Sequence, residues 1–153
     1  MSEPIFRVSS GDQFWPHTWV VCADLVMSLT REGEVPDDHW QLYLEDLRRP
    51  TTKVVLGFGV GSMSVNSKQR RLAAPELNGK RVAAVLNSSV ARGIATAFSW
   101  LGLPIRSFAF GRQQVLDAFT YLNSPLITPE RGLELAEQLF RESGAPTIDE
   151  LAV

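Results

Sequence analysis

The sequence predicts a single α/β domain with a four- to five-stranded, mostly parallel sheet and helices on both faces. The first observation is residues 80–110, where an apolar run at 82–86 is followed by polar residues, a helical apolar pattern and a second apolar run. The second is that further short apolar runs precede this stretch. Because a strand–helix–strand unit joins parallel strands through a right-handed crossover, these runs are expected to share one sheet.

Composition limits the class of protein. The chain has 153 residues, 44% of them hydrophobic, which suits one domain with a core large enough to fold alone. A net charge of -2 disfavours a general nucleic-acid binder. The single cysteine, Cys22, cannot form an internal disulfide and suits a reducing compartment. No leader pattern and no run near the roughly 20 apolar residues of a membrane span is present, so we expect a cytoplasmic protein without membrane insertion.

The first half of the chain predicts three strands and one helix. Residues 5–9 alternate briefly and predict an edge strand, and the continuous apolar run 19–27 predicts one buried strand. Asp37 or Asp38 is expected to cap the helix that follows. The apolar face of that helix is formed by Trp40, Tyr43, Leu44 and Leu47. Residues 53–58 predict the next strand.

A glycine- and serine-rich loop then leads into a second helix, in which Asn66 and Gln69 have the spacing of a capping box. The strand at 82–86 is expected near the centre of the sheet, followed by a third helix. The apolar positions of the third helix are Val90, Ile94, Ala97, Phe98 and Leu101. Gly93 lies inside this pattern, and we expect it to allow close packing of the helix against a strand.

Two helices are expected after the last strand, at 105–110. The apolar stripe of residues 113–122 predicts the first of them. The second is an additional C-terminal helix at about 128–143, with Thr128 as its capping residue and Gly144 as its stop signal.

The best candidate sites lie beyond the carboxyl ends of the strands, where ligands usually bind in parallel sheets. The loop and helix start after residue 58 contain Ser62, Ser64, Asn66, Ser67, Arg70 and Arg71. Three interpretations remain open for this group: ordinary capping and turn chemistry, binding of an anion at the helix N-terminus, or a modified switch serine. The spacing of a nucleotide P-loop is absent. A second, similar group follows the strand at 82–86 and consists of Asn87, Ser88 and Arg92. For this group, N-capping of the next helix is the more economical interpretation.

Catalytic patterns are scarce. His17 and His39 lack the spacing of a metal pair, and a lone histidine is expected at the surface or hydrogen-bonded. Asp24 is expected at a partly solvated strand end, with a phospho-acceptor or metal ligand as the alternative. Trp15, in a predicted loop, is an interface candidate. No nucleophile elbow is present, so no catalytic residue, metal site or cofactor is expected.

The order of elements resembles the anti-sigma-factor antagonist and sulfate-transporter (STAS) class of small α/β domains, in the broad SpoIIAA-like sense. The stretch RVAAVLNSSVARGIATAFSWLGLPIRSF, followed by an amphipathic helix, carries most of the resemblance, which spans about residues 19–122. The resemblance implies a non-enzymatic domain that binds partner proteins. It also implies phosphorylation of a serine at the start of the helix after a central strand, which corresponds here to Ser62, Ser64 or Ser67.

We therefore expect one SpoIIAA-like domain over residues 1–153, with its core at about 19–122. The expected function is a cytoplasmic regulatory or protein-interaction module that binds a protein partner through residues 59–71. The alternative is a small phosphate- or nucleotide-binding protein or enzyme that uses the loops at 59–67 and 87–92. A homodimer is compatible with either function.

Overall fold

The computed structural model describes residues 3–9, 13–61, 63–88, 93, 96 and 104–152. Within these residues the main sheet has six strands, in the order β1-β2-β3-β5-β7-β8. The strands are β1 (Ile5–Arg7), β2 (His17–Cys22), β3 (Leu25–Thr30), β5 (Val54–Gly59), β7 (Arg81–Leu86) and β8 (Ile105–Phe108). The last four are parallel to one another, whereas β2 is antiparallel to both of its neighbours. The predicted single α/β domain with a mostly parallel sheet is confirmed, but the strand number exceeds the predicted four to five.

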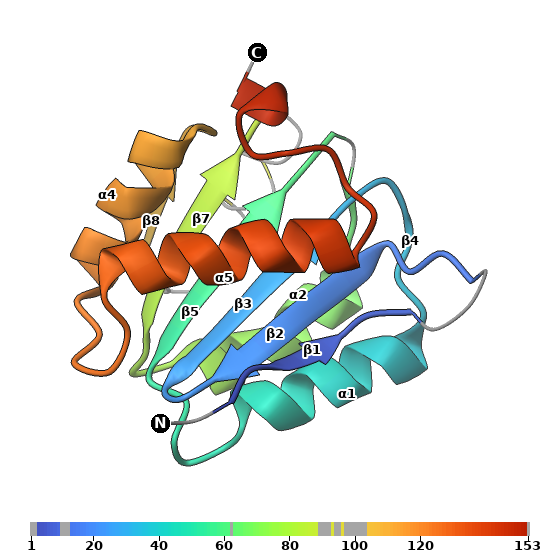
Figure 1. The fold of residues 1–153 in the computed structure, drawn as a ribbon. Coiled ribbons are helices and arrows are strands. Elements are labelled where there is room, and N and C mark those ends of the chain that lie inside the picture. The colour runs from blue at the N-terminus through green and yellow to red at the C-terminus, as the bar shows by residue number, and fades with distance from the viewer. Residues whose placement is uncertain are drawn as a thin grey trace.

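Helices cover both faces of this sheet, as predicted. They are α1 (Asp37–Leu47), α2 (Ser67–Leu77), α4 (Arg112–Leu122) and α5 (Pro129–Glu142), and a short 3₁₀ turn, η1 (Glu150–Ala152), follows. Figure 1 shows α5 crossing one face, with α4 beside it, and α2 behind the other face. Each face has its own apolar core, one under α4 and α5 and one under α1 and α2. None of the helices in the described residues is long and apolar enough to cross a membrane.

A short parallel pair, β4 (Gly33–Glu34) and β6 (Met63–Ser64), joins two loops at the carboxyl edge of the sheet. The first loop follows β3 and the second follows β5. This pair fixes the path of the chain just before α2. It therefore helps to position the predicted site.

The prediction of one strand over residues 19–27 is wrong, because this run is a hairpin. Strands β2 and β3 are joined at Ala23 and Asp24, and Ala23 has a left-handed φ of 53°. Every residue of both strands is buried, so no polar alternation interrupts the apolar run. Asp24 therefore lies in a turn at the amino edge of the parallel strands, and its carbonyl accepts hydrogen bonds from the backbone N–H groups of Lys53 and Val54.

Two predicted helix starts are confirmed by their hydrogen bonds. The Asn66 side chain accepts from the Gln69 N–H at 2.8 Å, and the Gln69 side chain accepts from the Asn66 N–H at 3.1 Å. The Thr128 hydroxyl accepts from the Arg131 N–H at 3.2 Å. These reciprocal or single caps satisfy N–H groups that a helix N-terminus would otherwise leave unpaired.

Two local predictions are wrong. Neither Asp37 nor Asp38 is the N-cap of α1, because Pro36 occupies that position with an extended backbone and both acids lie in the first turn. Gly93 does not pack closely against a strand, because it is exposed and an added Cβ would meet no atom of the described residues within 4 Å.

Some predictions fall outside the described residues. They concern Ser62, Arg92 and the apolar face of the third predicted helix, namely Val90, Ile94, Ala97, Phe98 and Leu101. These stay predictions.

Candidate functional site

The two predicted loops meet at the carboxyl edge of the sheet. The Asn87 side-chain oxygen accepts a hydrogen bond from the Gly61 N–H at 3.0 Å, and the Ser88 hydroxyl donates to the Gly61 carbonyl at 2.8 Å. The Val60 N–H also donates to the Thr30 carbonyl at 2.9 Å. The loop after β5 is therefore joined to the ends of β3 and β7.

The polar side chains at the start of α2 also bond within the chain. Asn66 serves the capping box. The Arg70 guanidinium donates to the Val65 carbonyl at 2.6 Å and to the Ser67 hydroxyl at 3.1 Å, and Arg71 Nε donates to the Ser67 carbonyl at 3.4 Å. These contacts give Asn66, Ser67 and Arg70 structural roles, and a binding role for these residues stays a prediction.

The solvent-facing side of α2 has an unusual charge arrangement. We define the α2 outer face as Lys68, Arg71 and Leu72, which are all exposed. Lys68 lies 3.9 Å from the Asp37 carboxylate, and both of these side chains are more than half exposed. The ion pairs of the described residues include neither Arg70 nor Arg71. No acidic residue lies in the first turn of α2, although that end of a helix favours negative charge.

A cavity of about 110 Å³ lies between the sheet and the helices α1 and α2. Four polar side chains of the described residues line it: His17, Ser28, Thr30 and Tyr43. The remaining lining is apolar and includes Trp40, Val55, Leu77, Val82 and Leu86. No Lys, Arg, Asp or Glu is among the described residues of this lining.

The cavity follows from the register of the three central strands. Ser28 of β3 pairs with Gly57 of β5, which in turn pairs with Ala84 of β7. These three small residues lie side by side under the helices, so little side-chain volume fills the space above them. A Cβ added to Gly57 would lie 3.6 Å from Ser28 Oγ, which is an ordinary contact.

His17 is the least expected residue of this lining. It is only 1% exposed, and its Nδ1 has no hydrogen-bond partner within the described part of the chain, so the expectation of a surface or hydrogen-bonded histidine is wrong for this atom. Its ring packs against those of Trp19, Trp40 and Tyr43 at centroid distances of 5.1, 5.2 and 4.4 Å. Burial, together with the nearby His39, lowers the pKa of His17 to about 3, so the imidazole is neutral at pH 7.

Tyr43 is also buried in this cluster. Burial raises its pKa to about 12, and a hydrogen bond with Ser28 opposes part of that shift. Both hydroxyl groups therefore stay protonated near neutral pH. The polar end of the cavity is thus formed by neutral groups that can donate or accept hydrogen bonds.

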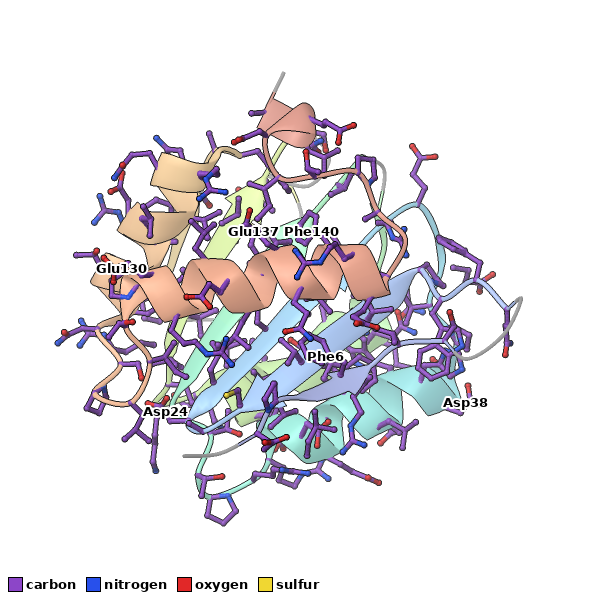
Figure 2. The ribbon with its side chains drawn as sticks, viewed as in Figure 1. Phe6, Asp24, Asp38, Glu130, Glu137 and Phe140 are labelled. Atoms are coloured by element: carbon purple, nitrogen blue, oxygen red, sulfur yellow. The ribbon has the colours of Figure 1, made fainter. Side chains whose placement is uncertain are left out.

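Two other predicted candidates lie elsewhere. The Ser124 hydroxyl contacts both carboxylate oxygens of Asp24, at 2.7 and 2.9 Å, which supports a structural role for Asp24. Figure 2 shows Asp24 and Asp38 at opposite ends of the sheet, so Asp24 is remote from the start of α1. Trp15 is half-buried, with its ring 4.2 Å from that of His39, and its role as an interface residue stays a prediction.

Comparisons of the chain with family models, with curated proteins and with solved structures found no match. The resemblance to the STAS class therefore stays a prediction based on the order of elements.

Proposed function

We propose that this chain is a non-enzymatic regulatory module that binds an acidic segment of a partner protein through the α2 outer face and the adjoining loop. The observation that carries the proposal is the group of cations at the N-terminal end of α2, which has no acidic residue in its first turn. Leu72, 40% exposed beside these cations, adds an apolar contact.

The positive charges at the start of α2 are only partly balanced within the isolated domain. A helix N-terminus carries a partial positive charge, so each nearby cation costs about 0.3 to 1 kcal/mol at low ionic strength. Lys68, Arg70 and Arg71 all lie in the first five residues of α2, and of the three only Lys68 is paired with a carboxylate of the described residues, that of Asp37 at 3.9 Å. A carboxylate from a partner would relieve this repulsion and would accept charge-assisted hydrogen bonds from a guanidinium. An acidic partner is therefore the chemistry that this surface fits.

Hydrogen bonds within the chain hold the α2 outer face and the loop before it in place. The capping box fixes the first turn of α2, and the contacts of Asn87 and Ser88 with Gly61 fix the preceding loop. A preorganised surface loses little conformational freedom when a partner binds. Phosphorylation of Ser64, in the segment before α2, would add up to two negative charges there, and we expect it to weaken binding of an acidic partner.

The phosphate- or nucleotide-binding alternative has less support. A phosphate needs hydrogen-bond donors, and the backbone N–H groups of Gly61, Asn66 and Gln69 already donate to side chains of the chain. The cavity lining in the described residues has no cation that would neutralise a phosphate.

The test compares surface variants that leave the internal hydrogen bonds of Arg70 intact. A partner retained from an extract of the native host is purified, and its affinity is measured for the wild type, Arg71→Glu and Leu72→Ser. The matched control is Lys53→Glu, which makes the same charge change at an exposed position just before β5, at the opposite edge of the sheet.

We expect Arg71→Glu to weaken binding at least tenfold and Leu72→Ser several-fold, because both remove contacts central to the proposed interface. Lys53→Glu should bind within twofold of the wild type, and thermal unfolding should confirm that all variants are folded. Equal affinity of the wild type and both α2 variants would exclude this face as the binding surface.

A further inference from the structure

Strand β1 forms one edge of the main sheet, beside α1 (Figure 1). Among the described residues its only strand partner is β2, and outside that ladder no backbone hydrogen bond of the described chain involves residues 3–9. An edge strand with free N–H and C=O groups is a template for pairing with another chain. This edge is separate from the α2 outer face, so the inference below does not depend on the proposed acidic partner.

The backbone groups of Phe6 point away from β2. The Arg31 N–H donates to the Pro16 carbonyl at 2.7 Å, which extends the ladder of β2 and β3 by one residue pair. Hydrogen-bonded pairs alternate along an antiparallel ladder, so the even-numbered residues of β2 bond to β3 and the odd-numbered ones bond to β1. The β2 partners of Ile5 and Arg7 are odd-numbered. Ile5 and Arg7 therefore use their backbone groups for β2, which leaves the N–H and C=O of Phe6 facing outward.

The side chains at this edge also favour a partner. Ile5 is 41% exposed, and Leu42 of α1 is 47% exposed. Ile5 lies on the same face of the sheet as Arg7, which bonds to Asp46 of α1 at 3.1 Å and lines one hollow together with Leu42. Glu3, on the same face, is exposed and takes part in no ion pair of the described residues. The edge thus presents exposed apolar side chains between an unpaired acid and a cation.

We propose that two copies of this chain pair through their β1 strands, antiparallel to each other about a two-fold axis at Phe6, so that their two sheets become one. A two-fold axis brings the same surface together from both copies, so the contact has to be self-complementary. The N–H and C=O of Phe6 bond to those of the partner's Phe6. The Val8 N–H bonds to the carbonyl of the partner's Pro4.

The missing N–H of Pro4 helps to select this register. An axis at Ile5 would place Pro4 opposite Phe6, and the outward carbonyl of Phe6 would then have no donor, because proline has no N–H. With the axis at Phe6, only the carbonyl of Val8 lacks that donor, and Val8 lies beyond the end of β1. The central hydrogen bonds of the pairing are therefore complete only in the proposed register.

Charge supports the same register and a second copy as the occupant. An axis at Arg7 would place two arginines directly opposite each other, which is destabilising. With the axis at Phe6, Ile5 lies opposite the partner's Arg7, and Glu3 is the diagonal neighbour of that arginine, within reach of a long side chain. This pair of opposite charges occurs twice by symmetry.

The experiment measures the mass of the whole chain by analytical ultracentrifugation over a range of concentrations. We expect the mean mass to rise from that of one chain toward that of two as the concentration reaches about 1 mM, since a short strand pairing gives a weak interface. Hydrogen exchange of the Phe6 amide should slow over the same range. The mass of a single chain throughout, or a dimer in which exchange at Phe6 is unchanged, would overturn the proposal.

Two substitutions of opposite charge at one exposed position test the register. Ile5→Lys places a cation opposite the partner's Arg7 and should weaken dimerisation at least tenfold. Ile5→Glu removes the same apolar side chain but places an acid there, so its dimer should be at least fivefold tighter than that of Ile5→Lys. The control is Leu126→Lys, at a 65% exposed apolar side chain between α4 and α5, which should dimerise as the wild type does.

Thermal unfolding should confirm that all three variants are folded, as expected for changes at exposed positions. Equal dimerisation of Ile5→Lys and Ile5→Glu, or wild-type dimerisation of Ile5→Lys, would contradict the proposal.

Discussion

The contact between α4 and α5 makes an unusual prediction about a helical glycine. Gly132 lies in α5, and a Cβ added there would be 2.6 Å from three ring atoms of Phe119, a residue of α4. Real Cβ atoms essentially never lie so close to another heavy atom. Phe119 is buried in the core under α4 and α5, so its ring has little free space into which it could move. We therefore expect Gly132→Ala to destabilise the protein.

Two opposing terms set the magnitude. Helix propensity favours alanine over glycine by about 1 kcal/mol inside a helix. Overpacking of a well-filled core typically costs about 1 to 3 kcal/mol, and the short contact places Gly132→Ala toward the upper part of that range. The net change is a loss of about 1 to 2 kcal/mol in the free energy of unfolding. At Gly93, which is exposed and where an added Cβ would meet no atom of the described residues within 4 Å, only the first term acts. Gly93→Ala should stabilise the protein by about 0.5 to 1 kcal/mol.

Urea unfolding followed by circular dichroism measures both changes. A double variant tests the mechanism, because Phe119→Leu removes the ring that the new methyl group meets. Gly132→Ala should therefore cost less in the Phe119→Leu background than in the wild type, with a coupling energy of at least 0.5 kcal/mol. The reasoning is refuted if Gly132→Ala is as stabilising as Gly93→Ala, or if the double variant is strictly additive.

Three further predictions concern buried polar groups. Asp46 is 4% exposed and accepts a hydrogen bond of 2.7 Å from Trp19 Nε1. Asp46→Ala should therefore lower the free energy of unfolding, measured by urea unfolding, by about 2 to 4 kcal/mol. A loss below about 1 kcal/mol would contradict this prediction. The folded-state pKa of His17 lies at about 3, below the ordinary 6.5, so below pH 6.5 the unfolded chain takes up a proton that the folded chain does not. Stability should therefore fall by about 1.4 kcal/mol per pH unit between pH 6 and 4, and unfolding curves of His17→Phe that show the same slope would disprove this origin. Ser124→Ala removes the hydroxyl group that contacts the Asp24 carboxylate and should cost about 1 to 2 kcal/mol, whereas an unchanged thermal midpoint would show that the contact contributes nothing.

Features that depend on neighbouring residues in the sequence were predictable. The capping box of Asn66 and Gln69 and the cap of Thr128 follow from the preference of short polar side chains for helix N-termini. The strands β5 and β7 were predicted from their apolar runs, because strands buried on both faces have few polar residues.

The same apolar signal concealed the hairpin of β2 and β3. Asp24 is the one polar residue in the run, and a single acid at such a position indicates a strand end as readily as a turn. The left-handed conformation of Ala23 had no residue-type signal, since glycine or asparagine usually marks such a position. The additional strand in the observed sheet follows from this turn.

The cavity could not be predicted because it depends on strand register. Ser28, Gly57 and Ala84 are far apart in the sequence, and only the pairing of three strands brings them together. His17 was likewise a lone histidine in the sequence, and its burial follows from packing against Trp40 and Tyr43 of α1.

The most direct test of the proposed function is to map the partner's contact surface on the folded domain by amide NMR. The domain, labelled with ¹⁵N, is titrated with the purified partner, and the shift changes are assigned along the chain. The proposal predicts the largest changes at Lys68, Arg71 and Leu72, with weaker changes at higher salt because the contact is partly electrostatic. Changes confined to α4 and α5, on the opposite face of the sheet, would contradict it.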